Sequence, residues 1–195
     1  MASTILVDKI DPQSGTALEI GTSGDTITVP SGATFNVAGT LQSGGAAVAN
    51  TPAFFAYADA AQNVSSSTNT LVTLDNESYD TDNAFAANRF TVPSGEAGKY
   101  FFHGQIDCHA NNVSENSISN ALLYKNGSII LESVVDFRNN QGRRVSVNAS
   151  VVLDLAVGDY IELYGNILDT SGNPTFYSTT GTFFTFLTGY KLIGV

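Results

Sequence analysis

Val145–Tyr164, VSVNASVVLDLAVGDYIELY, is the stretch of sequence that decides the fold. Apolar residues occupy every second position over 145–155, and polar residues fill most of the positions between them. This alternation predicts a strand with one buried face, because successive side chains of a strand point to opposite sides. Gly158 permits the positive φ of a turn, and Ile161 and Leu163 then resume the alternation in a second strand.

The other face of this second strand carries Tyr160, Glu162 and Tyr164. Two aromatic side chains on the face opposite the core predict a packing surface for a partner chain. Phe183, Phe184 and Phe186 add further aromatic residues near the end of the chain. We therefore expect these strands to bury aromatic side chains between subunits.

The composition bounds the kind of protein and its partners. A chain of 195 residues is long enough for one domain with a real core and a short appendage. Only 13% of the residues are charged, and the formal net charge of −10 disfavours nucleic acid and anionic membrane surfaces as partners. The lone Cys108 excludes an intrachain disulfide and suits a small buried apolar residue. Residues 5–7, ILV, are too short an apolar run for a signal peptide or a membrane span.

Residues 1–41 follow a different pattern from the rest of the chain. Two similar stretches, residues 24–30 and 32–38, repeat eight residues apart, and each carries an apolar pair, Ile27/Val29 or Phe35/Val37. Strands this short bury their apolar side only by stacking on neighbours or on copies from other chains. The alternative is a small meander that lies on the main domain. Residues 42–53, rich in Gly and Ala and closed by Pro52, predict a linker.

From residue 54 onward, short strands separated by turn residues predict an all-β sandwich or jelly roll. Asn126-Gly127 is the strongest hairpin signal, since both residues tolerate the positive φ of a type I′ turn. The expected strands are 54–58, 70–75, 84–91, 99–109, 118–125, 128–135, 145–155, 160–166 and 182–192.

Several motifs in this part resemble the C1q/TNF-like head domain. They are Tyr79-Asp80, Phe85, Phe90, Pro93, GKYFF at 98–102, LLYKNG at 122–127, LDLAVGD at 153–159 and FLTGYKL at 186–192, and they cover roughly residues 54–195. The resemblance implies a ten-stranded jelly roll and a tight homotrimer. The sequence departs from secreted animal members in lacking a signal peptide and a Gly-X-Y stalk, which argues against a complement-like role.

The first forty residues are similar in style to a second group, the N-terminal segments of bacteriophage fibre and appendage proteins. ILVDKI at 5–10 and GATFNV at 32–37 carry this likeness. It implies that residues 1–41 attach to other virion proteins or form a short β-structured shaft. The two resemblances together imply a trimeric viral appendage with a jelly-roll head.

Candidate functional residues follow from the same strands. Alternation over 99–109 puts Phe101, His103, Gln105, Asp107 and His109 on one face. These residues could bind a metal if three copies converged on a trimer axis, but a polar face hydrogen-bonded at a subunit interface is the favoured interpretation. The residues predicted at the trimer interface are Phe101, His103, Tyr160, Tyr164, Phe184 and Phe186.

Two loops carry the remaining charged candidates. Arg138, Arg143 and Arg144 concentrate positive charge in an acidic chain, and they could hold a glycan, a carboxylate or a neighbouring subunit. Solvated loop charges are the alternative interpretation. The acidic stretch TLDNESYDTD at 73–82 lacks the spacing of an EF-hand and predicts a solvated loop rather than a calcium site.

These observations favour a non-enzymatic virion structural protein, a homotrimeric bacteriophage fibre or appendage on tail or capsid. Its partners would be its own copies, other virion proteins through residues 1–41, and possible host-surface glycan or protein. A cellular C1q-like carbohydrate-binding module is the second hypothesis, and a glycan-cleaving enzyme is the third. No motif indicates a catalytic residue, a resident metal or a cofactor.

Overall fold

The computed structural model describes residues 20, 24–39, 42–43, 46–47, 50–110, 115–170 and 172–193. The chain divides into two compact units, Met1–Val48 and Ala49–Val195. Within the described ranges there is no helix, and so none long and apolar enough to cross a membrane. The all-β fold class predicted from the sequence is confirmed.

The described part of the first unit differs from the sequence prediction. The two repeated stretches contain no strand within 24–39, and Ile27 and Phe35 are 65% and 71% exposed. Two short strands, β1 (Gln42–Ser43) and β2 (Ala46–Ala47), pair instead within the predicted linker. A single chain thus leaves these apolar side chains uncovered, because stretches this short cannot bury them without neighbours. Residues 1–19, the first part of the predicted attachment segment, lie outside the described residues.

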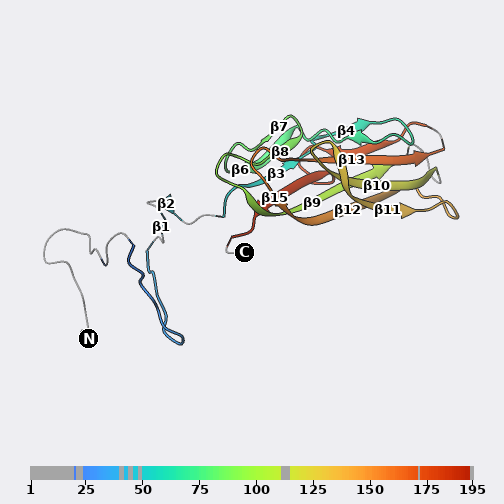
Figure 1. The fold of residues 1–195 in the computed structure, drawn as a ribbon. Helices are drawn as coiled ribbons and strands as arrows, with labels where there is room; N and C mark the ends of the chain where they lie inside the picture. Colours follow the sequence, from blue (N-terminus) through green and yellow to red (C-terminus); the bar gives the residue numbers. More distant parts are fainter. Residues whose placement is uncertain are drawn as a thin grey trace. The chain divides into compact units, whose positions relative to one another are not determined.

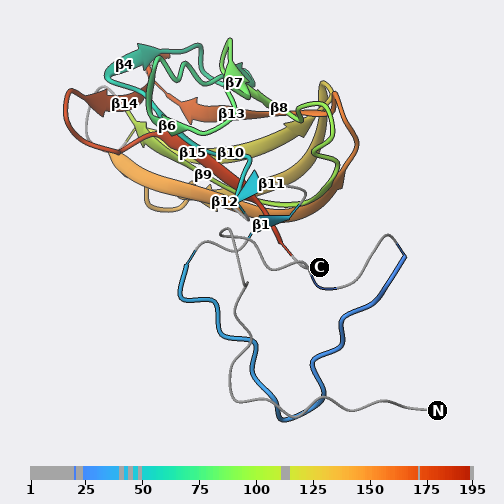
Figure 2. The same ribbon diagram turned by 90° about the vertical axis from the view of Figure 1, so that its left-hand side faces the viewer.

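The second unit is a sandwich of two antiparallel sheets (Figures 1 and 2). The first sheet has the order β4-β14-β9-β15-β3-β6, with β12 paired on β9. Its strands are β3 (Ala53–Tyr57), β4 (Ala60–Asn63), β6 (Asn76–Asp80), β9 (Gly98–His109), β12 (Arg144–Leu155), β14 (Thr175–Thr179) and β15 (Phe186–Lys191).

The second sheet has the order β11-β10-β13-β8-β7, with β5 paired on β13. Its strands are β5 (Thr70–Leu71), β7 (Phe85–Ala86), β8 (Arg89–Thr91), β10 (Asn116–Lys125), β11 (Ser128–Asp136) and β13 (Tyr160–Asp169). The predicted jelly-roll sandwich is confirmed by this arrangement of two packed sheets.

The stretch that decides the fold forms β12, the following turn and the start of β13. β12 pairs with β9 along its whole length, from Arg144 opposite His109 to Leu155 opposite Gly98. The predicted alternation is confirmed, since Val147, Ala149 and Leu155 are buried in the core. In β9, the inward residues Tyr100, Phe102, Ile106 and Cys108 are completely buried. Burial also raises the pKa of the Cys108 thiol to about 12.

Two turns lie where the sequence predicts them. Asn126 and Gly127 join β10 to β11 with φ values of 52° and 78°, the left-handed values that a type I′ hairpin requires. Asp159 closes the neighbouring turn, because its carboxylate accepts hydrogen bonds from the Ala156 N–H and the Asn126 amide. Lys125 pairs with the same carboxylate at 2.8 Å, and these contacts lower the pKa of Asp159 to about 2.

The sequence prediction of an acidic loop at 73–82 is wrong over residues 76–80. These residues form β6, which pairs with β3 at the edge of the first sheet. The Asp80 carboxylate accepts the backbone N–H of Phe85 at 2.8 Å, and Asp75 accepts the N–H of Asp59 at 3.0 Å. Both carboxylates therefore organise loops, although Asp75 is exposed to solvent. Strands β4 and β14 were not predicted either, and the predicted strand at 84–91 is divided by a turn at Ala87-Asn88.

The two sheets approach closely where glycine faces a large side chain. A Cβ added to Gly104 in β9 would lie 2.7 Å from Cδ1 of Leu163 in β13. A Cβ on Gly165 in β13 would overlap the ring of Phe176 and crowd Cδ1 of Ile106 at 2.9 Å. Only glycine fits at these two positions, because real Cβ atoms do not approach other heavy atoms so closely.

The register places both ends of the second unit at one end of the sandwich. Ala53, the first residue of β3, lies opposite Tyr190 near the end of β15. We call this the proximal end. The strand ends around His109, Arg144 and Thr175 meet at the opposite, distal end, where Thr175 and Arg144 both lie opposite His109.

We predict that Gly165→Ala lowers the free energy of unfolding by about 1–3 kcal/mol, because the added methyl group overpacks the space that Phe176 fills. Urea unfolding followed by circular dichroism measures this change. Gly142→Ala is the matched control, since nothing lies within 4 Å of a Cβ there. Equal stability of the two variants would contradict the close packing described for Gly165.

Candidate functional site

The outward side of the first sheet carries a cluster of exposed and half-buried aromatic rings. We call it the aromatic face, and its members are Phe55, Tyr57, Tyr79, Phe101, His103, Phe183, Phe186 and Tyr190. Phe55 is at its centre, with ring centroids of Phe183 and Phe186 at 5.0 and 5.1 Å. Tyr79 and Phe183 are 47% and 52% exposed. Such a contiguous exposed patch is typical of a surface that binds another macromolecule.

His103 lies within this face and is uncharged at neutral pH. Its ring packs on Phe186 at 5.4 Å, and its Nδ1 lies 2.7 Å from the hydroxyl of Ser150. Burial lowers the pKa of His103 below its ordinary value. Burial also lowers the pKa of His109, and the nearby Arg143 and Arg144 lower it further. Among the described residues, no group of three or more His, Cys, Asp or Glu side chains is placed to hold a metal.

An ion pair between the buried Asp107 and the partly exposed Arg144 lies on the same side of the sheet, at the distal end. Asp107 is only 2% exposed, and both of its carboxylate oxygens accept Nε–H of Arg144, at 2.8 and 3.0 Å. The hydroxyl of Ser146 donates to the same carboxylate at 3.0 Å. The guanidinium of Arg144 also stacks over the rings of Tyr177 and Phe184, at 4.9 and 4.6 Å. The hydrogen bond from Arg144 to Asp107 raises the pKa of Arg144.

The outward side of the second sheet has a different character. Tyr124 and Tyr164 stack with ring centroids 4.0 Å apart. Arg89 stacks over the ring of Tyr160 at 4.4 Å and pairs with Glu162 at 2.8 Å. Amide side chains surround the rings, as described below. We call this surface the tyrosine face.

The structure divides the six predicted interface residues between the two sheets. Phe101, His103 and Phe186 belong to the aromatic face, and Phe184 lies beside Arg144 on the same sheet. Tyr160 and Tyr164 lie on β13, in the opposite sheet. The six residues therefore do not form one continuous surface on a single chain.

Four residues of the aromatic face were not predicted from the sequence, namely Phe55, Tyr57, Tyr79 and Tyr190. Alternation in the predicted strand 54–58 puts Phe55 and Tyr57 on one face, which is a signal that could have found them. No local sequence signal predicts that Tyr79 belongs to the aromatic face, because it joins the face only through the pairing of β6 with β3.

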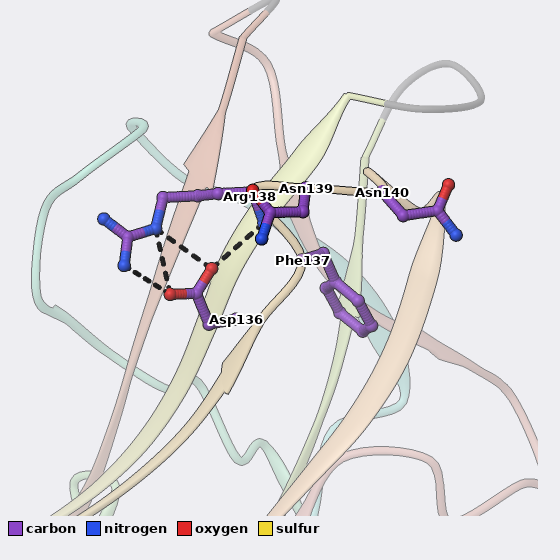
Figure 3. Close-up of a pocket in the computed structure, with 5 residues that line it drawn as sticks. All are labelled: Asp136, Phe137, Arg138, Asn139 and Asn140. Atoms are coloured by element: carbon purple, nitrogen blue, oxygen red, sulfur yellow. Dashed lines mark hydrogen bonds and ion pairs between the residues drawn. The ribbon is translucent and has the colours of Figure 1, made fainter.

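Two of the three predicted receptor-binding arginines, Arg138 and Arg144, are already paired with a carboxylate in the single chain. Arg138 forms an ion pair with Asp136 beside an open pocket of about 660 Å³, which Figure 3 shows with Phe137, Asn139 and Asn140 around it. Arg144 is the first residue of β12 rather than a loop residue, and it is held by Asp107. Arg143 precedes it, and its carbonyl accepts the Ala110 N–H at 2.8 Å. Only the exposed Arg138 and Arg143 remain at a loop surface.

We predict that Arg144→Gln lowers the free energy of unfolding by about 2 kcal/mol, because it leaves the buried Asp107 carboxylate without its cation. Arg143→Gln is the matched control, and its effect should stay within about 0.5 kcal/mol. Combining Asp107→Asn with Arg144→Gln should recover part of the loss, because the buried charge is then removed as well. Chemical denaturation of the four proteins measures these differences, and an undisturbed Arg144→Gln variant would show that the pair is not structural.

Comparisons with known proteins identify the fold. No family model and no curated protein matches the chain. Among solved structures, Eiger TNF from S. frugiperda matches with a TM-score of 0.51 and 13% identity, over 73% of this chain and 93% of that chain. Murine APRIL at pH 8.5 matches with a TM-score of 0.50 and 16% identity, over 72% and 98% of the two chains.

The globular domain of zebrafish complement 1qA protein is also similar, with a TM-score of 0.47, 14% identity and coverage of 72% and 97%. At these identities the likeness concerns the fold alone. The second unit of this chain has a TNF-like jelly-roll fold, of the kind that its sequence motifs predict.

Proposed function

We propose that the protein is a non-enzymatic structural protein of a bacteriophage particle, a homotrimeric appendage whose head binds the host surface. In this proposal residues 54–195 are the head, residues 42–53 are the linker, and residues 1–41 attach to other virion proteins. The observation that carries the proposal is the aromatic face on the outward side of a C1q/TNF-like sandwich.

Two further copies of the chain are the partners that best fit the aromatic face. Phe183, Tyr79 and Tyr190 are exposed by 52%, 47% and 37%, and their rings continue a cluster that is already packed around Phe55. Covering this area removes apolar surface from water, at roughly 25 cal/mol per Å² of apolar area. His103 adds no charge at neutral pH, since burial lowers its pKa. The face therefore suits burial between subunits.

The position of the chain ends supports a parallel trimer. The start of β3 and the end of β15 lie together at the proximal end of the sandwich. In a trimer with parallel subunits, three N-terminal segments would leave the heads from this one end. The exposed apolar pairs Ile27/Val29 and Phe35/Val37 could then cover one another, which a single chain does not achieve.

The proposal of a bacteriophage protein rests on the resemblance of residues 1–41 to the N-terminal segments of bacteriophage fibre proteins. It also rests on the exposed apolar side chains of this segment, which require a partner to cover them. A short apolar repeat at one end of an exposed head suits an attachment segment, and the distal loops and the sides of the sandwich would face outward. In this proposal the protein is located in the virion, after synthesis in the host cytoplasm. The head binds its target without cleaving it.

We predict a native mass of three times the 20.5 kDa of one chain at micromolar concentration. Phe183→Lys should weaken the trimer, because it places a charge at an apolar contact. Phe183 is exposed in the single chain, so this variant should still fold. Native mass spectrometry and sedimentation equilibrium measure the mass.

Tyr164→Lys, on the opposite sheet, is the matched variant for this experiment. Under the proposal its mass remains that of the trimer. Dissociation by Tyr164→Lys alone would instead place the subunit contact on β13, and a native mass of one chain for the unsubstituted protein would refute the trimer altogether.

We also predict that a fragment of residues 49–195 folds and trimerises but does not join virus particles. Every member of the buried core cluster described for this chain lies between Phe54 and Leu187, so the fragment keeps the core. Circular dichroism and native mass measure folding and assembly, and incorporation into particles measures attachment. An unfolded fragment would show that residues 1–48 are part of the folding unit of the head.

A further inference from the structure

The tyrosine face combines flat rings and hydrogen-bonding groups in one row along β13. Tyr160, Glu162, Tyr164 and Asn166 occupy alternate positions on the outward side of this strand. Residues two apart on a strand are about 6.5–7 Å apart, so the row is about 20 Å long. Tyr124 of β10 stacks on Tyr164 at 4.0 Å and broadens the row in its middle.

A network of amides lies beside the stacked rings. Asn166 donates Nδ2–H to Oδ1 of Asn69 at 2.7 Å, and Asn69 donates Nδ2–H to the Tyr124 hydroxyl at 3.1 Å. Because the Tyr124 hydroxyl accepts this bond, its own proton stays available to a ligand. The hydroxyl of Tyr164 makes no hydrogen bond with any residue in the part of the chain that the structure describes.

Asn120, which lies opposite Asn166 in the sheet, adds an unsatisfied acceptor. Its Nδ2–H donates to Glu132 at 2.6 Å, whereas its Oδ1 is buried and has no partner among the described residues. A buried acceptor without a hydrogen bond is destabilising, so a rotation of this amide that exposes Oδ1 to a ligand hydroxyl would remove that penalty.

The charges at the centre of this face are matched within the chain, and Glu132 on the edge strand β11 accepts the Asn120 amide. The carboxylate of Glu162 is almost fully buried and is paired with Arg89 at 2.8 Å. The guanidinium of Arg89 covers one ring, that of Tyr160. The face thus presents rings, hydroxyls and amides without an unpaired charge at its centre, which favours an uncharged polar ligand.

We infer that the tyrosine face binds a neutral oligosaccharide chain. A sugar ring has an apolar side of C–H groups that stacks on an aromatic ring, and its hydroxyls both donate and accept hydrogen bonds. Tyr124 and Tyr164 offer the stacking surface, and Asn69, Asn120 and Asn166 offer amides with both donors and acceptors. The length of the row accommodates several sugar rings in succession.

The chemistry of this face distinguishes it from the aromatic face of the first sheet. The aromatic face is dominated by phenylalanine and suits a dry contact with another protein subunit. The tyrosine face alternates its rings with amides. In a dry contact these amides would lose their hydrogen bonds to water, whereas a ligand with many hydroxyls can replace those bonds. In the proposed trimer, which this inference extends, three such faces would bind one surface together and add weak sites by multivalency.

An array of immobilised oligosaccharides tests the inference with the full chain. The array carries neutral hexose and N-acetylhexosamine oligomers, together with sialylated and uronate-containing ones. We expect binding to at least one neutral class and, where that class is a 1→4-linked hexose oligomer, loss of the signal after mild periodate treatment, which cleaves its vicinal diols. Tyr164→Ala and Tyr124→Ala should each weaken binding to that oligomer in solution by about tenfold or more.

Two controls make the result specific. Tyr164→Phe keeps the stacking ring and should lose less affinity than Tyr164→Ala. Val157→Ala removes an exposed apolar side chain from the turn before β13, outside both faces, and should bind like the unsubstituted protein. Circular dichroism of each variant confirms that it folds.

The inference is overturned by an array without signal, by binding confined to charged sugars, by binding to a 1→4-linked hexose oligomer that survives periodate, or by binding that both alanine variants retain. The native mass of the same samples keeps the proposed function separate. A monomer that still binds the neutral oligomer would refute the trimeric appendage and leave this site standing. A trimer that binds no sugar would refute this site and leave the trimeric appendage standing.

Discussion

The close contact between glycine in one sheet and a large side chain in the other is the constraint on which the rest of the structure depends. Phe176 fills the space beside Gly165, and Leu163 fills the space beside Gly104. These contacts hold β9 and β13 together at the centre of the sandwich. Because side chains alternate along a strand, fixing the inward residues of these two strands also fixes which residues point outward. The aromatic face on β9 and its neighbours, and the tyrosine face on β13, are therefore consequences of the same packing.

The two outward faces divide the chemistry of the head between them. On the first sheet, phenylalanine rings pack on one another around Phe55, and the polar residues among them are internally satisfied, as His103 is by Ser150. On the second sheet, tyrosine rings alternate with amides and with the matched pair of Arg89 and Glu162. Dehydrating the first face removes mostly apolar surface from water, whereas dehydrating the second requires a partner that replaces many hydrogen bonds. The same fold thus offers a subunit contact on one side and a polar binding surface on the other.

The sequence predicts the strands that carry regular alternation, because alternation is a local property. The strands over 99–109 and 145–155, and the Asn126-Gly127 hairpin, follow from residues close together in the chain. Strand β6 could not be predicted this way, since NESYD has no buried apolar residue and exists as a strand through its pairing with β3. The same limit applies to the site: nothing near Arg144 reveals that its partner is Asp107, or that Tyr164 would stack on Tyr124 from another strand. The alternation predicts that Tyr160 and Tyr164 point away from the core. It does not predict which of the two sheets contains their strand.

The pairing of the cations bears on what the head can bind. In an isolated loop, arginine suits carboxylates and phosphates, because its fork of donors matches their oxygens. In this chain Arg89, Arg138 and Arg144 are each paired with a carboxylate, of Glu162, Asp136 and Asp107. An anionic ligand would have to displace these partners and approach a chain whose net charge is −10. A neutral ligand meets neither cost, and it can use the hydroxyl and amide groups that the paired charges leave accessible. The charge distribution and the tyrosine face therefore point to the same class of ligand.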